Sequence, residues 1–193
     1  PRSTQGVSSA ASDVYKRQVR GKTKEAILDA NDKVDRALRA GAMAVGATVE
    51  IETLPGYLPL RNAAMMGDLF CKNAEVLFGV DEVSEVGHRT GATDMGDVSH
   101  IMPAIHPYIA GASGPGHSAD WHIADKELGY LSPAKMLAGL AVALLQGDAE
   151  KAQEVIEQHK PAMSKQEYLD FQGSIFKTEV YDGGKGEAEA DVK

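Results

Sequence analysis

The chain has 193 residues, 43% of them hydrophobic, and its 28 acidic residues outnumber its 20 basic residues, so the formal net charge is −8. This length and apolar content suffice for a buried core of one domain or two small ones, whereas the acidic balance without a Lys/Arg cluster argues against a nucleic-acid partner. The single cysteine, Cys71, excludes an intramolecular disulfide and a cysteine-rich zinc site, and it favours a reducing, cytoplasmic location.

The first 18 residues are small and polar and have no usable hydrophobic period. They also lack the apolar core of a signal peptide. We expect residues 1–18 to be a non-native leader, with native sequence beginning near Val19.

Hydrophobic spacing predicts the elements that follow. Residues 23–45 are predicted to form an amphipathic helix, with Thr23 as its cap and Gly46 as its stop. Alternation of apolar and acidic residues predicts a half-exposed strand over residues 48–54. A second helix is expected over residues 62–78, with a domain boundary near residues 57–61.

Glycine, proline and histidine crowd into residues 87–121, where only residues 98–102 and 104–109 are apolar enough to be short strands. Loops of this composition usually carry sites. After them, Ser132 and Pro133 predict the start of a helix to about residue 146, apolar nearly all round and therefore buried in an α/β layer.

The last predicted elements are short. Asp148 is expected to cap a helix to residue 158, and Ser164 with Glu167 has the spacing of a capping box. Residues 183–193 contain little to bury and are expected to be a disordered tail. The apolar stretch over residues 136–145 is far short of the roughly 20 residues that span a membrane, so no membrane partner is expected.

Residues 91–121 offer the donors for chemistry. The imidazole of His117 on a glycine-rich turn, together with Asp94, Asp97 and Asp120, is a reasonable donor set for a metal such as zinc. From composition alone, a solvent-exposed or hydrogen-bonded role for any one histidine is the stronger interpretation.

The string GATDMGDVSHIMPAIHPYI, residues 91–109, is similar to the "STDxGxVS…PxIHP" segment of the metal-dependent amidohydrolase and dipeptidase family. That family includes the aminoacylases, carboxypeptidase G and p-aminobenzoyl-glutamate hydrolase, all of them zinc peptidases. The resemblance implies an α/β fold made of the C-terminal half of a zinc-peptidase catalytic domain and the last helix and strand of a ferredoxin-like lid. The implied division is a lid and dimerisation part over residues 19–58 and a catalytic part over residues 59–182.

The resemblance also implies a chemistry. Family members hold two divalent metal ions, here expected to be zinc with manganese or cobalt compatible, and a metal-activated water attacks an amide carbonyl. His117, in a Gly-His-Ser turn, matches the family's late metal ligand, while Thr93, Asp94 and His106 match the substrate pocket.

Alternatives stay open for several of these residues. Asp94 is equally consistent with a turn former. A structural role for His106 is as consistent with the sequence as a place in the pocket. His100 is better interpreted as a partly buried strand residue than as a site residue. A compact local metal site of His117, Asp120 and His122 is a minority interpretation.

The family's His-x-Asp motif and Glu-Glu pair, which supply further ligands and the general base, occur nowhere in these 193 residues. We therefore expect a fragment of a hydrolase that cleaves an N-acyl amino acid, an aminobenzoyl-glutamate-like compound or a dipeptide. The isolated chain should be inactive, and the complete protein should be a homodimer formed through the lid. The alternative is a non-enzymatic small α/β module that binds a ligand or partner.

Overall fold

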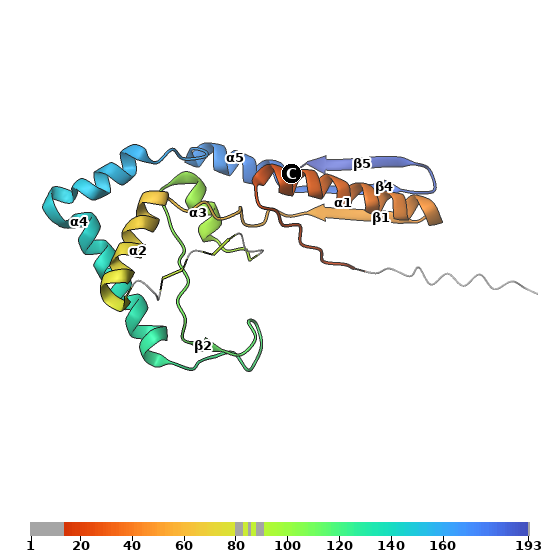
Figure 1. Cartoon of the computed structure of the whole chain (residues 1–193). Helices are drawn as coiled ribbons and strands as arrows, with labels where there is room; N and C mark the ends of the chain where they lie inside the picture. The colour runs from red at the N-terminus through yellow and green to blue at the C-terminus, as the bar shows by residue number, and fades with distance from the viewer. Residues whose placement is uncertain (1–13, 80–82, 85, 88–90, 193) are drawn as a thin grey trace, which may run out of the picture.

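The computed structural model describes residues 14–79, 83–84, 86–87 and 91–192. It has an α/β composition, as the sequence predicts, and its elements form two parts (Figure 1). One part is a small antiparallel sheet with a long helix lying along it, and the other is a group of helices with a long loop.

The sheet part begins with the predicted first helix and strand. Helix α1 spans Lys24–Val45, Thr23 caps its start through a bond from the Ala26 amide, and Gly46 ends it in the left-handed conformation at φ 65°. Strand β1, Thr48–Thr53, follows directly. Both predictions are confirmed because the capping residues and the period-two alternation are local signals.

Two strands from the end of the chain complete the sheet. Strand β4 spans Lys177–Asp182 and strand β5 spans Glu187–Val192, and the antiparallel order is β1-β4-β5. The chain leaves the sheet part near the expected boundary after residue 58, and its last two strands return to that part, since β4 pairs with β1 along its full length.

The expectation of a disordered tail over residues 183–193 is wrong, because residues 187–192 form β5. The missed signal is the alternating Glu-Ala-Glu-Ala-Asp-Val pattern after a glycine-rich turn, which is typical of a hairpin.

Helix α1 is held to the sheet by ion pairs and by a small apolar core. Arg39 makes a two-point contact with the Glu179 carboxylate, and Lys177 Nζ lies 3.1 Å from Asp35 Oδ2. Ile51 and Tyr181 are buried between the helix and the strands. Because charge-assisted bonds reinforce apolar packing, this part has a defined interior of its own.

The second part contains four α-helices within the residues that the structure describes. They are α2 (Ala64–Phe78), α3 (Met95–Ile101), α4 (Ser132–Gln158) and α5 (Lys165–Ile175). A π-helical turn, Glu127–Leu131, runs into α4, and the short strands β2 (Ala112–Ser113) and β3 (His122–Ile123) pair antiparallel.

Helix α2 packs closely on α4 where Asn73 meets Met136 and Gly139. Asn73 Nδ2 donates to the Met136 carbonyl at 3.1 Å, and a Cβ at Gly139 would lie 2.3 Å from the same nitrogen. Glycine at position 139 is therefore what allows the two helices to approach.

Helix α4 contains the two helices that the sequence predicts, one to about residue 146 and a second to residue 158. They meet at a break where residues 146–149 leave helical geometry. Asp148, expected to cap the second helix, lies inside that break at φ 59°, which is not the extended conformation of an N-cap residue. The expected burial in an α/β layer is also wrong, since Leu137, Val142 and Leu145 are exposed while Met136 is buried. Among the described residues, the elements in repeated contact with this helix are α2 and the π-helical turn.

The segment Glu127–Gln158 has the length and composition of a membrane-spanning helix: it has 32 residues and an 18-residue window of mean hydropathy 1.5, 17% of it buried. It is longer than the predicted apolar stretch because the π-helical turn precedes α4 and α4 continues past the break to Gln158. The core helix of a soluble protein passes the same test, and the break at residues 146–149 would leave backbone groups unpaired in lipid.

The two short strands predicted over residues 98–102 and 104–109 are also wrong. Residues 98–101 belong to α3, and residues 104–109 form no regular element. A short apolar run does not distinguish a strand from a buried helical turn, and here the glycine at position 96 allows the helical turn to pack closely.

Candidate functional site

Helix α3 is hydrogen-bonded to the linker between the two parts of the molecule. Asp97 Oδ1 accepts from the Leu58 amide at 2.9 Å, and Ser99 Oγ accepts from the Arg61 amide at 2.9 Å. The Ser99 hydroxyl in turn donates to the Gly96 carbonyl at 2.6 Å. Two side chains of the family-like motif therefore bind protein backbone.

The contact between α3 and the linker at residues 58–61 is close as well as polar. A Cβ at Gly96 would lie 1.8 Å from the Leu58 carbonyl oxygen, so only glycine fits at this position. On the other side of α3, the His100 carbonyl accepts from the amides of Ala162 and Met163 at 2.9 and 3.2 Å. We name α3 with residues 58–61 and 162–163 the α3 clamp, because it ties the linker to the chain that leads into α5.

The carboxylate of Asp97 is partly withdrawn from water in this clamp. Burial raises the pKa of Asp97 above its ordinary value, and the Leu58 amide and the nearby His100 oppose that rise. Because Asp97 Oδ1 already accepts a backbone hydrogen bond, its role here is to position the linker.

Thr93 and Asp94, the predicted substrate-binding pair, lie just before α3. The Thr93 hydroxyl donates to Asp94 Oδ1 at 3.0 Å, and the Asp94 carbonyl accepts from the Asp97 amide at 3.0 Å. Asp94 stands at the N-cap of α3 without a side-chain capping bond. Both residues are therefore turn formers in this structure, and their part in substrate binding stays a prediction.

His106 lies beyond α3 in the extended stretch. Its backbone amide donates to Asn62 Oδ1 at 3.2 Å, and its ring centroid is 5.5 Å from that of Tyr108. Its Nδ1 atom is buried and, within the part of the chain that the structure describes, has no hydrogen-bond partner. A buried imidazole nitrogen without a partner is costly, so His106 is the better placed of the predicted pocket residues to meet a ligand.

His117, the predicted metal ligand, lies in the loop between β2 and β3. It is exposed and has a left-handed backbone at φ 61°. Gly114 closes the base of this loop, since a Cβ there would lie 2.4 Å from the Asp120 carbonyl oxygen. We name residues 114–121 the His117 loop.

The minority interpretation of a local site of His117, Asp120 and His122 finds no support. Over residues 14–79, 83–84, 86–87 and 91–192, no three His, Cys, Asp or Glu side chains gather in a metal-binding arrangement. His122 instead places Nδ1 2.8 Å from the Asp120 carbonyl oxygen. One exposed imidazole does not make a metal centre, so these residues alone do not fit the metal pair that the resemblance implies.

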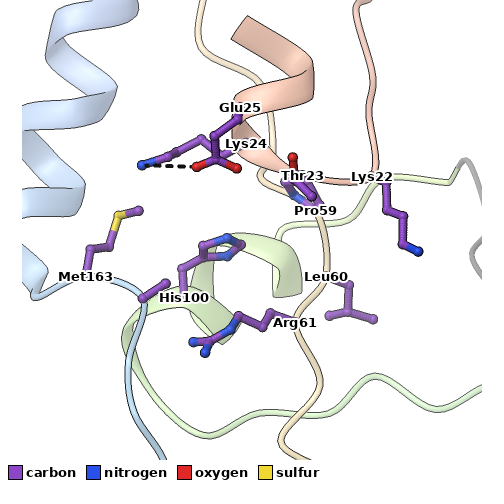
Figure 2. A pocket seen from close by; sticks show the side chains of 10 residues that line it. Lys22, Thr23, Lys24, Glu25, Pro59, Leu60, Arg61, His100 and Met163 are labelled. Atoms are coloured by element: carbon purple, nitrogen blue, oxygen red, sulfur yellow. Dashed lines mark ion pairs between the residues drawn. The ribbon is translucent and has the colours of Figure 1, made fainter.

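A cavity lies elsewhere, where the start of α1 meets the α3 clamp (Figure 2). His100 is buried beside it, in a helix and not in the strand expected for it. None of the four predicted site residues lines this cavity. Its basic lining residues, Lys22, Lys24 and Arg61, were missed because they come from separate segments and form no cluster in the sequence.

Comparison with known proteins gives a partial similarity. The chain is 33% identical to the Xaa-Arg dipeptidase of Mus musculus over 81 residues, which is 40% of this chain and 19% of the mouse protein. It is 31% identical to the Xaa-Arg dipeptidase of Homo sapiens over 123 residues, 58% of this chain and 28% of the human protein. No family model matches the sequence, and no solved structure matches it.

The chain thus spans less than a third of the length of these curated relatives. The similarity supports a distant relationship with peptidases in general, in agreement with the family-like motif of residues 91–109. It is consistent with a peptidase-like hydrolase.

Proposed function

We propose that this chain is part of a dipeptidase-type hydrolase that cleaves the amide bond of a dipeptide. N-acyl amino acids and aminobenzoyl-glutamate-like compounds are the further substrates to consider. The observation that carries the proposal is the 31–33% identity to Xaa-Arg dipeptidases. The resemblance of residues 91–109 to the amidohydrolase motif agrees with it.

The substrate class follows from the names of the relatives and from charge. A dipeptide with arginine in its second position is cationic at its side chain, and this chain carries a formal net charge of −8. An acidic protein attracts a cationic substrate and raises its local concentration. Dipeptides ending in arginine are therefore the first substrates to test.

His117 is proposed as a metal ligand. Its imidazole has no hydrogen bond within the described residues, and its place on an exposed loop leaves it accessible to donors from another polypeptide segment. The remaining ligands and the general base would come from residues outside this chain, so the 193-residue chain alone is expected to be inactive. Two divalent ions are proposed, with zinc as the first candidate and manganese or cobalt compatible.

A homodimer in the cytoplasm is part of the same proposal. Strand β1 is at the edge of the described sheet, and an edge strand leaves backbone groups open to a second copy. The single Cys71 fits a reducing compartment.

The test is hydrolysis of a panel of dipeptides and N-acyl amino acids by the longest polypeptide that the gene encodes, supplied with zinc or manganese. The His117→Ala variant should lose at least about 100-fold in kcat/KM, since losing even an indirect partner of a metal site costs 10–100-fold. His122→Ala is the matched control, because it removes a neighbouring exposed histidine at the base of the same loop.

Two outcomes would contradict the proposal. Equal activity of the His117→Ala and His122→Ala variants would remove His117 from the metal site. A folded polypeptide that hydrolyses no member of the panel with either metal would favour the non-enzymatic binding module.

A further inference from the structure

Helix α4 is apolar nearly all round between Ser132 and the break, where Lys135 is the single charged residue. Met136 and Leu140 are buried, on the side where Asn73 of α2 meets the helix. The opposite side is exposed, and we name it the outer face of α4: Ala134, Leu137, Ala138, Ala141, Val142 and Leu145. Its three large side chains are 62–67% exposed. A helix that is apolar all round belongs in the core of a larger body or in a membrane.

Lipid does not fit the outer face of α4. The regular helix from Ser132 to Leu145 is about 21 Å long at 1.5 Å per residue, whereas the hydrocarbon core of a bilayer is about 30 Å thick. Residues 146–149 then leave helical geometry, and residues 150–158 contain three glutamates and a lysine. Backbone groups at a break and charged side chains are both costly in lipid. Protein is therefore the better match for this face.

A second copy of the chain is also a poor match. Each copy has a formal net charge of −8, which opposes the close association of two copies. Among the described residues, the elements in repeated contact with α4 are α2 and the π-helical turn, so the outer face has no cover among them. The aligned region is 28% of the human dipeptidase. A polypeptide of that length has ample further residues to cover the face.

The start of α4 lies next to the base of the His117 loop. Strand β3, which follows that loop, packs on the π-helical turn that leads into α4, since a Cβ at Gly129 would lie 2.6 Å from Ile123 Cγ2. The Gly129 amide also donates to the Asp125 carbonyl at 2.8 Å. A segment docked along α4 would therefore pass near the loop at which the proposed function requires donors from outside this chain.

We propose that the outer face of α4 binds an apolar face of the same polypeptide, formed by residues outside these 193. Alanine at three of the six positions allows a neighbouring helix or strand to approach closely. A charge on the docked segment would lose water without gaining a partner, so that segment must be uncharged where it meets the face. The proposal rests on the proposed origin in a longer, dipeptidase-type polypeptide, and it is tested without metal or substrate.

The test is thiol labelling of Leu145→Cys, in the 193-residue chain and in the longest polypeptide that the gene encodes. Mass spectrometry of the alkylated peptide separates the introduced thiol from that of Cys71. The thiol should react at least about tenfold more slowly in the longer polypeptide, because it is reached there only when the interface opens. Leu137→Cys, on the same face, is a second probe and should behave alike.

Leu169→Cys is the matched control, because it replaces an exposed leucine of another helix, α5. Its labelling rate should be similar in the two polypeptides. Equal rates for Leu145→Cys in both would overturn the proposal, and so would a gene that encodes no residues beyond these 193.

Two further outcomes would overturn it by assigning the face to another occupant. Protection in both polypeptides that increases with protein concentration would assign the face to a second copy. Protection that requires lipid vesicles would assign it to a membrane. Absence of amide hydrolysis, in contrast, would contradict the proposed function and leave the labelling result unchanged.

Discussion

The α3 clamp and the His117 loop come from one stretch of sequence, residues 91–121, and they differ in almost every physical respect. In the clamp, Ser99 is fully buried, Gly96 touches backbone, and Asp97 is hydrogen-bonded to the linker. In the loop, His117 is exposed and makes no hydrogen bond within the described residues. Residues 91–121 therefore include residues that hold the chain together and an exposed histidine for which metal binding is proposed.

The largest expected effect is that of Gly96→Ala on the clamp. The added methyl group would lie 1.8 Å from the Leu58 carbonyl oxygen, so either α3 or the linker at residues 58–61 must move. We expect a loss of about 3 kcal/mol in the free energy of unfolding, measured by urea denaturation. Gly67→Ala in α2 is the control: nothing lies within 4 Å of the added atom, and the variant should gain about 0.5–1 kcal/mol. Similar changes in the free energy of unfolding for both variants would show that α3 is not in close contact with the linker.

Ser99→Ala should have the next largest effect. It leaves the Arg61 amide without its acceptor in a part-buried place, which costs about 2 kcal/mol of unfolding free energy. Ser118→Ala in the His117 loop removes an exposed hydroxyl that bonds the Pro115 carbonyl, and it should change stability by less than about 0.5 kcal/mol. If Ser118→Ala lowers the free energy of unfolding as much as Ser99→Ala does, the contrast between the α3 clamp and the His117 loop is wrong.

His117→Gly should stabilise the protein by about 1 kcal/mol, because glycine adopts the left-handed backbone at φ 61° without strain. His122→Gly, in strand β3, should do the opposite, since glycine weakens a strand. Thermal denaturation shows whether each substitution raises or lowers the stability of the protein. A destabilised His117→Gly variant would mean that the imidazole packs against the protein.

The smallest expected effect is the pH dependence due to Asp97. Its folded pKa is raised by burial, so the folded state binds its proton more tightly than the unfolded state. This contribution to stability is present at low pH and is lost as pH rises from the ordinary value of 3.8 through the folded pKa.

The quantity to measure is the stability of Asp97→Asn minus that of the unchanged protein, by urea denaturation across this window. The difference should increase with pH, because the amide keeps an acceptor for Leu58 and does not ionise. A difference that is constant or decreases with pH would mean that Asp97 is not desolvated in the clamp.

The sequence predicted elements whose signals are local. Thr23 and Gly46 bound α1, and Ser164 with Glu167 forms the expected capping box, because each depends on residues three or four positions apart. The same reasoning failed for β5, where the partner strand gives the short alternating segment its structure. It also failed for residues 98–101, where close packing on Leu58 favours a helical turn.

The motif predicted His117, Thr93, Asp94 and His106 as site residues, and those roles stay predictions. Spacing in the sequence says nothing about contacts made between distant parts of the chain. Asp97 and Ser99 bind backbone about 38 or 39 positions away, and Arg61 meets His100 only in the folded cavity. Tertiary contacts of this kind have no periodic signature.

The most direct test of the account is a pair of measurements on Ser99→Ala and His117→Ala in the longest encoded polypeptide: dipeptide hydrolysis with metal supplied, and the free energy of unfolding. The account predicts opposite patterns, with His117→Ala losing activity and keeping stability, and Ser99→Ala losing stability and keeping activity while folded. If Ser99→Ala abolishes activity in the folded protein, or His117→Ala leaves it unchanged, the division between the α3 clamp and the His117 loop is wrong.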